Sequence, residues 1–324
     1  MLILAKASMA LMLGFVLSLI TGLIIVPLFK KLHFGQSVRH LKKEGTPTMG
    51  GLIFIIPVIV SLILLYLKGS ISISYNLIIV VFVFLAYGLL GFIDDFMKVK
   101  YHNNNGLSLV TKFLIQMIIA LVFFYLFMKG GGEPVLSISF LNIYINLGWM
   151  FGLFILFLLV GTTNAVNITD GLDGLAGGLS AIAFFAYGVI SWNAGWLEGY
   201  QEIAIFCFLL VGAIIGFLVF NTHPARIFMG DLGSLALGGA LASVAIVSRH
   251  EISLAIIGGV FVVETLSSLI QIISIRYFNK KVFLKAPLHH HFEELGWQET
   301  DIIKLFWVVG FILAMAAITY GVWL

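Results

Sequence analysis

The chain has 324 residues, of which 61% are hydrophobic and 10% are charged, and its net charge is +3. Its mean hydropathy of +1.11 lies far from the balance of a soluble domain. About ten spanning helices of roughly 20 residues each would leave only connecting loops, which excludes a separate soluble domain. The lone cysteine, Cys207, lies in an apolar run and excludes a disulfide framework and a thiolate metal cluster. We therefore expect an all-α polytopic membrane protein with a single transmembrane domain over residues 1–324.

Uninterrupted apolar stretches predict ten membrane spans. In chain order they lie near residues 8–29, 50–67, 75–97, 109–128, 147–166, 174–192, 201–220, 231–248, 252–275 and 302–323. This even number places both termini on one side of the membrane. The loops on that side contain only four of the 18 Lys and Arg residues, namely Lys6, Lys68, Lys129 and Arg249. The positive-inside bias therefore assigns both termini to the exterior and the other set of loops to the cytoplasm.

Two adjacent acids, Asp94 and Asp95, end the predicted span 75–97, and Lys98 lies one helical turn after Asp94. Carboxylates are costly at a hydrocarbon boundary, and two adjacent ones cannot both ionise freely in a low dielectric without a nearby cation. The pair therefore indicates a metal site or a proton-transfer site. A helix-end acid paired with Lys98 is the alternative, and it accounts for one of the two acids better than for both.

The exterior loop at residues 135–146 differs from the other exterior loops, which are short. Its first half, Val135-Leu136-Ser137-Ile138-Ser139-Phe140, alternates in polarity, and Ile143-Tyr144-Ile145 can pair back onto it. This pattern predicts a small exterior β-hairpin. An irregular linker is the alternative.

Three polar residues between the spans 147–166 and 174–192, namely Asn167, Asp170 and Asp173, repeat at three-residue spacing. They share one face if the segment is helical, and a simple capped turn would need only one of them. Asp231 begins a later span in the run Phe228-Met229-Gly230-Asp231, where an ordinary N-cap is the alternative. A hard cation that bridges substrate phosphates, as magnesium does, would need only one or two of these oxygens.

Two polar residues, Glu264 and Gln271, lie inside the ninth apolar stretch. An ionisable group at that depth indicates a functional or packing role. We expect a structural role for Glu264, and the sequence leaves the role of Gln271 open. Ser267 and Ser268 predict that the helix is bent or broken near them.

Three consecutive histidines, His289 to His291, lie in the run Ala286–Glu293 before the last span. Consecutive side chains point in different directions, so the three imidazoles cannot all reach one ion. Contact with phosphate, or positioning of a single histidine, suits the basic surroundings better, and a solvated polar loop is the alternative. The five aspartates discussed above, and every histidine except His250, fall on the predicted cytoplasmic face. This distribution predicts an active site on that face.

Five motifs occur in an order that resembles a known superfamily. They are Thr46-Pro47-Thr48-Met49-Gly50-Gly51, Gly91-Phe92-Ile93-Asp94-Asp95 with Lys98, Asn164–Ala176, Phe228-Met229-Gly230-Asp231 and the His289–His291 loop. Together they span most of the chain and resemble the polyprenyl-phosphate N-acetylhexosamine-1-phosphate transferases. The ordered set is highly specific, although a single Asp-Asp pair is weak. The Ala286–Glu293 loop and the run Thr169–Gly174 resemble the branch that uses UDP-MurNAc-pentapeptide more than the branch that uses UDP-N-acetylglucosamine.

The resemblance implies a Mg²⁺-dependent enzyme of the bacterial cell membrane whose single transmembrane domain is catalytic. Its implied reaction transfers phospho-MurNAc-pentapeptide from UDP-MurNAc-pentapeptide to undecaprenyl phosphate, giving lipid I and UMP, in the first membrane step of peptidoglycan synthesis. The implied partners are these two substrates, membrane lipid and a second copy of the chain in a homodimer. No nucleic-acid partner is expected.

By similarity, Asp231 binds Mg²⁺ together with Asn167, while Asp94 or Asp95 deprotonates or orients the lipid phosphate. The implied catalytic residues that meet phosphate charge are Lys98, Lys112, His289 and His290, with His291 as a further substrate contact. The implied uridine end consists of Gly171, Asp173, Asn221, Phe228 and Gln271, where the Phe228 ring would stack. The remaining implied neighbours of the substrate are Asp170, Thr48 and Lys43.

Two other functions fit parts of the sequence. A cation-coupled transporter could use the acids as an ion relay, but a transport path needs polar groups at the midplane, and only Glu264 is placed there. A related sugar-1-phosphate transferase that uses UDP-N-acetylglucosamine is the second alternative, and a donor competition assay distinguishes it.

Overall fold

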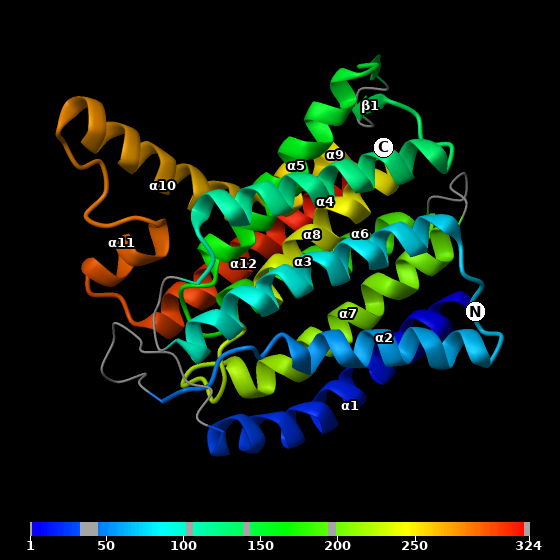
Figure 1. The fold of residues 1–324 in the computed structure, drawn as a ribbon, viewed down its shortest axis with the longest axis horizontal. Coiled ribbons are helices and arrows are strands. Elements are labelled where there is room, and N and C mark those ends of the chain that lie inside the picture. The colour runs from blue at the N-terminus through cyan, green and yellow to red at the C-terminus, as the bar shows by residue number, and fades with distance from the viewer. Residues whose placement is uncertain (1, 33–44, 102–105, 139–142, 194–198, 321–324) are drawn as a thin grey trace.

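The computed structural model describes residues 2–32, 45–101, 106–138, 143–193 and 199–320. The described part is a helical bundle with one two-stranded sheet (Figure 1). Its helices are α1 (Leu2–Lys31), α2 (Leu52–Leu67), α3 (Tyr75–Lys100), α4 (Leu109–Lys129), α5 (Met150–Thr169), α6 (Leu175–Asn193), α7 (Tyr200–Asn221), α8 (Gly230–Val247), α9 (Glu251–Ile257), α10 (Gly259–Phe278), α11 (Leu288–Glu294) and α12 (Glu299–Ile318). The strands are β1 (Val135–Ile138) and β2 (Ile143–Asn146).

Nine of these helices are long and apolar enough to cross a membrane, and α2 is an apolar helix of 16 residues. They correspond to the ten predicted spans, which confirms the all-α polytopic fold class. Many large apolar side chains on α1, α4 and α10 stay exposed, such as Leu23, Ile118 and Ile272. Exposed apolar side chains of this kind are suited to lipid tails rather than to water.

Helix α8 forms the centre of the bundle, and every residue from Leu232 to Val247 is buried. Helices α3 and α5 pack against α8, while α7 packs between α1 and α6. The close approach of α3 to α8 depends on Gly91, where an added Cβ would overlap the Asp231 carbonyl oxygen. Small residues at helix contacts let backbones approach in this way. The approach brings the end of α3 beside the start of α8.

The exterior hairpin is confirmed. Strands β1 and β2 pair antiparallel, with Val135 opposite Asn146 and Ile138 opposite Ile143. The first described turn of α1, the last described turn of α12 and this hairpin lie toward one end of the bundle, whereas α11 lies toward the other (Figure 1).

The ninth predicted span was wrong in one respect. The helix is interrupted at Gly258, which separates α9 from α10, and it continues without a break through Ser267 and Ser268. The Ser267 hydroxyl donates to the Glu264 carbonyl within the helix at 2.7 Å, so this polar group is satisfied inside the helix.

Candidate active site

Three carboxylates converge on the ammonium of Lys98 at the end of the bundle where α3 stops and α8 starts. Lys98 Nζ lies 2.6 Å from Asp94 Oδ2, 2.8 Å from Asp231 Oδ2 and 3.7 Å from Asp95 Oδ1. Asp94 and Asp95 are buried, and they reach Lys98 at i+4 and i+3 spacing along α3. The predicted pairing of Lys98 with an acid is therefore present, but it extends to both acids and to a third one far away in sequence.

Asp231 is held from two further directions. Lys112, in the first turns of α4, places Nζ 2.7 Å from Asp231 Oδ2. Asn167, near the end of α5, donates from Nδ2 to Asp231 Oδ1 at 2.7 Å and contacts Ser234 Oγ at 2.8 Å. Asn167 thus orients the Asp231 carboxylate in this structure. Asp231 is the residue around which α3, α4, α5 and α8 meet.

Backbone amides fix the other two carboxylates. Asp95 Oδ2 accepts a hydrogen bond from the Leu232 N–H at 3.0 Å, and Asp94 Oδ1 accepts one from the Leu107 N–H at 2.8 Å. Asp95 is fully buried, and its Oδ1 has no hydrogen-bond partner among the described residues. A buried oxygen without a donor is costly unless a cation or a bound ligand satisfies it.

The acid cluster, defined as Asp94, Asp95 and Asp231, has the donor chemistry of a hard-cation site. Each residue offers a carboxylate oxygen, and these oxygens all lie within 4.8 Å of one another. Magnesium prefers oxygen ligands and usually needs only one or two carboxylates, because it keeps waters and binds phosphate oxygens. Asp95 Oδ1, which lies 3.7 Å from Lys98 Nζ and has no hydrogen-bond partner among the described residues, provides an available ligand atom. The cluster therefore fits Mg²⁺ by its chemistry.

A cavity of about 260 Å³ adjoins the acid cluster. Its lining includes most of the residues predicted for the substrate site, namely Thr48, Asn167, Asp170, Gly171, Asp173, Asn221 and Phe228, together with Asp95, Lys98 and Asp231. The segment that carries Phe228 is held by backbone pairing with residues 47–51, in which the Phe228 N–H donates to the Pro47 carbonyl and the Gly50 N–H donates to the Phe228 carbonyl. Two motifs that are far apart in the sequence thus form one wall of the cavity.

Two polar groups in this cavity are poised to meet a ligand. Asn221 is buried and donates from Nδ2 to the Ile227 carbonyl at 3.0 Å, while its Oδ1 has no hydrogen-bond partner in the described part of the chain. Burial, followed by the negative charges of Asp231, Asp95 and Asp173, raises the pKa of Asp170 well above its usual range. Asp170 is therefore protonated more readily than an ordinary aspartate.

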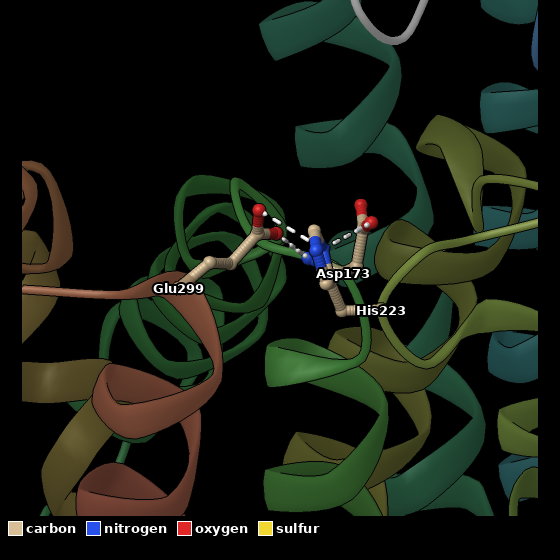
Figure 2. Close-up of side chains that lie close together, drawn as sticks. All are labelled: Asp173, His223 and Glu299. Atoms are coloured by element: carbon tan, nitrogen blue, oxygen red, sulfur yellow. Dashed lines mark hydrogen bonds and ion pairs between the residues drawn. The ribbon is translucent and has the colours of Figure 1, made fainter.

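A second cavity, of about 890 Å³, shares Gly171, Leu172, Asp173 and Phe228 with the first. At its edge His223 stands between two acids, with Nδ1 3.2 Å from Asp173 Oδ2 and 3.2 Å from Glu299 Oε2 (Figure 2). Neither His223 nor Glu299 was predicted from the sequence as a site residue. The position of His223 inside the run between Asn221 and Phe228 was an available signal, but no spacing in the sequence links Glu299 to either motif.

The three histidines of the triplet have three different partners, as their spacing predicts. They lie on the short helix α11, where His289 Nδ1 is 2.8 Å from Glu264 Oε2, His290 Nδ1 is 2.5 Å from Glu293 Oε2, and His291 Nδ1 accepts from the Leu284 N–H at 3.2 Å. His289 is buried against Gly171, where an added Cβ would overlap its Nε2. His290 lines the larger cavity, and burial lowers its pKa despite the Glu293 carboxylate.

Two predicted site residues are placed differently from the rest. Gln271 is buried in α10 and uses its amide to hold the following segment, because Oε1 accepts from the Val282 and Phe283 N–H groups and Nε2 donates to the Phe283 carbonyl. Gln271 does not line either of the two cavities described above. Lys43 lies outside the described residues.

Comparison with known proteins places these residues in a family. A family model described as glycosyl transferase family 4 matches residues 77–249, and a phospho-N-acetylmuramoyl-pentapeptide-transferase signature matches residues 43–55. The chain is 48% identical to the phospho-N-acetylmuramoyl-pentapeptide-transferase of Geobacillus sp. (strain WCH70) over 322 residues, which cover 98% of each chain. It is 46% identical to the protein of the same name from Bacillus subtilis (strain 168) over 319 residues, which cover 97% of each chain. The chain therefore belongs to the phospho-N-acetylmuramoyl-pentapeptide-transferase family, within glycosyl transferase family 4.

Proposed function

We propose that the protein transfers phospho-MurNAc-pentapeptide from UDP-MurNAc-pentapeptide to undecaprenyl phosphate, giving lipid I and UMP in the first membrane step of peptidoglycan synthesis. The observation that carries this proposal is the convergence of the acid cluster on Lys98 and Lys112 beside a cavity, in a chain that matches this family over nearly its full length. Phosphoryl transfer depends mainly on positioning and on neutralising phosphate charge, and these groups suit both tasks.

The phosphates of the two substrates would meet at the acid cluster. Lys98 and Lys112 would share their hydrogen bonds between Asp231 and phosphate oxygens, since each ammonium has three N–H donors. Asp94 or Asp95 would accept the proton of the lipid phosphate or orient that phosphate for in-line attack. Asp231 would hold Mg²⁺ together with Asn167, whose Nδ2 orients the Asp231 carboxylate. When bound, Mg²⁺ would neutralise charge on the diphosphate of the donor.

The uridine end of the donor would occupy the part of the cavity lined by Gly171, Asp173, Asn221 and Phe228. The Phe228 ring would stack on the base. Asn221 Oδ1, which is buried without a hydrogen-bond partner among the described residues, would accept from the base. This arrangement would satisfy an acceptor that otherwise costs free energy.

The prenyl chain of the acceptor would lie in an apolar groove between α10, α11 and α12. The groove has a volume of about 220 Å³ and is lined by Val260, Val263, Leu288, Phe292, Val309 and Leu313 among others. Val263 and Val309 are partly exposed on the apolar outer surface. Helix α11 also carries His289, which abuts Gly171. A prenyl chain in this groove would therefore bring its phosphate toward Gly171 and the cavity beside the acid cluster.

We further propose that residues 1–324 form one catalytic domain whose site faces the cytoplasm, and that the chain works as a homodimer. The charge distribution of the loops supports the orientation, since most Lys and Arg residues lie in the loops on the side of the acid cluster. The homodimer rests on family resemblance. The transporter alternative loses its main support, because Glu264, the acid placed at the midplane, is engaged by His289.

The proposed function is tested by incubating the purified protein in lipid with undecaprenyl phosphate and UDP-MurNAc-pentapeptide, and following UMP release and lipid-linked product together. We expect both products in equal amounts. UDP-N-acetylglucosamine, added in excess, should neither react nor compete. Equal use of UDP-N-acetylglucosamine would contradict the proposed donor and support the related sugar-1-phosphate transferase.

A further inference from the structure

Three segments that are remote in sequence meet at the edge of the larger cavity. They are the turn at residues 170–174 after α5, the loop that follows α7, and the first turn of α12. Asp173, His223 and Glu299 come from these three segments in that order, and Figure 2 shows their side chains pointing toward one another. We call these three residues the latch.

Polar contacts join the latch residues to one another and to the loop that follows α7. His223 Nδ1 lies 3.2 Å from both Asp173 Oδ2 and Glu299 Oε2. Glu299 Oε1 accepts from the Asp173 main-chain N–H at 2.8 Å, and Asp173 Oδ2 accepts from the Ala225 N–H at 3.0 Å. Glu299 therefore contacts both the imidazole and the backbone of the turn. Glu299 thus connects the start of α12 directly to Asp173, which lines both cavities.

Charge and burial make His223 necessary to this arrangement. The Asp173 side chain is only 4% exposed and that of Glu299 14% exposed, so the two carboxylates face each other with little water between them. Like charges in a low dielectric repel unless a donor or a cation lies between them. His223, which is 39% exposed, supplies the donor at that point. The other titratable groups that line this cavity are His290 and Glu293.

The turn that the latch holds is the wall shared by the two cavities. Gly171, Leu172 and Asp173 line the cavity beside the acid cluster as well as the larger one. The latch itself adjoins the larger cavity, and neither His223 nor Glu299 lines the smaller one or joins the acid cluster. A loosened latch would therefore displace the proposed uridine end and leave the groups that handle phosphate in place.

We propose that His223 and Glu299 are positioning residues that hold Asp173 and its turn in the conformation that binds the uridine nucleotide of the donor. The inference rests on the proposed function, and it names residues that determine affinity for the donor rather than the rate of phosphoryl transfer. Binding energy that is equal in the ground state and the transition state appears in KM and leaves kcat unchanged.

The test compares His223→Leu, His223→Asn and Glu299→Gln with the control Asp301→Asn. Asp301 is the other acid in the first turn of α12, but it pairs with exposed Lys304, so its variant controls for lost charge at that helix end. We expect His223→Leu and Glu299→Gln to raise the donor KM roughly three- to tenfold, with kcat and the acceptor KM within about twofold of the wild type. His223→Asn keeps an N–H near the Nδ1 position and should recover most of the loss, and Asp301→Asn should change nothing.

A parallel measurement uses UMP alone as the probe, in calorimetric titration of the full-length protein. In His223→Leu, UMP affinity should fall by the same factor by which the donor KM rises. The double variant His223→Leu/Glu299→Gln should bind UMP little more weakly than the weaker-binding of the two single variants, because both substitutions disrupt the same hydrogen-bond network. This binding assay does not depend on turnover, so it tests the latch even if the donor proves to be another UDP-sugar.

Several results would overturn the latch. Donor KM and UMP affinity equal to wild type in both His223→Leu and Glu299→Gln would show that the contacts do not position the turn. A fall in kcat at unchanged KM would assign these residues to catalysis. Stoichiometric Zn²⁺ binding that Glu299→Gln abolishes would show that the three side chains form a metal site instead of a hydrogen-bonded latch.

Discussion

Glu264 in α10 holds His289 in α11 by two contacts. Its Oε1 accepts from the His289 main-chain N–H at 3.0 Å, and its Oε2 lies 2.8 Å from His289 Nδ1. Both side chains are buried, and His289 Nε2 has no hydrogen-bond partner in the described part of the chain while it abuts Gly171. The carboxylate fixes the ring so that Nε2 points away from Glu264, in the way that an acid orients a catalytic histidine.

Replacement of Glu264 by Gln should therefore lower turnover, although Glu264 itself touches neither the acid cluster nor the smaller cavity. The amide keeps the size of the side chain but removes the negative charge that orients the imidazole ring, so we expect a fall in kcat of roughly ten- to a hundredfold. His289→Gln should show a similar fall, and the double variant should be little worse than either single one. UMP affinity should stay near wild type in all three. Independent, multiplying losses would contradict the pairing.

Gly91→Ala should destabilise the protein at the contact between α3 and α8, because the added Cβ would overlap the Asp231 carbonyl oxygen. We expect a loss on the order of 1–3 kcal/mol, with a lower Tm in detergent and lower activity, since Asp94 and Asp95 would move away from Asp231. Gly161→Ala in α5 is the matched control, because its Cβ would meet no other atom within 4 Å. A Tm in Gly91→Ala equal to that of Gly161→Ala would refute the close approach.

Glu251, at the start of α9 and outside the long spans, should make stability depend on pH. It is 2% exposed, neither carboxylate oxygen has a hydrogen-bond partner among the described residues, and burial raises its pKa to about 8. The unfolded chain loses this proton near pH 4.5, so the folded state binds more protons between about pH 4.5 and pH 8. The free energy of unfolding should therefore fall as pH rises through that window, and the cost is fully present above it.

The variant Glu251→Gln removes this titration. Its Tm relative to wild type should increase from about pH 5 to about pH 9, since only the wild type must ionise a buried acid. A difference between Glu251→Gln and the wild type that stays constant with pH would place this acid in a polar environment and contradict the structure.

The proposed orientation can be tested with two tyrosines of equal exposure. Tyr101, after α3, is 64% exposed, and Tyr144, on β2, is 65% exposed. After the buried Cys207 is replaced by Ala, Tyr144→Cys should react with an impermeant thiol reagent in intact cells, while Tyr101→Cys should react only after the membrane is opened. The reverse result would place the acid cluster outside the cell.

Much of the fold could be predicted from the sequence, because a membrane span is defined by length and apolar content alone. The same criterion missed the break at Gly258, since the residues on both sides of it are apolar and hydropathy does not record an interrupted backbone. The members of the acid cluster could be predicted as site residues, because a carboxylate at the boundary of the membrane hydrocarbon costs free energy. Their geometry was not, because Lys98 and Asp231 are 133 positions apart.

The contacts of the latch could not be predicted from the sequence either. His223 and Glu299 occur in short polar segments, where such residues are common, and only the packing of α12 against α6 brings Glu299 to the turn at Asp173. Gln271 is a polar residue in an apolar helix, a pattern that suggested a ligand contact. In the structure its amide holds Val282 and Phe283, so its place at the uridine end stays a prediction.

The central claim is that the acid cluster performs Mg²⁺-dependent transfer with divided roles, and comparison of Asp231→Asn with Asp94→Asn tests it most directly. Both variants should lose turnover by roughly a hundredfold or more, because a bound metal and a proton acceptor each contribute several kcal/mol to the barrier. Calorimetric titration with Mg²⁺ and UMP should then separate them: Asp231→Asn binds Mg²⁺ more weakly, whereas Asp94→Asn binds both ligands as the wild type does. Equal Mg²⁺ affinity in wild type and Asp231→Asn, or full turnover of the wild type in excess chelator, would contradict the account.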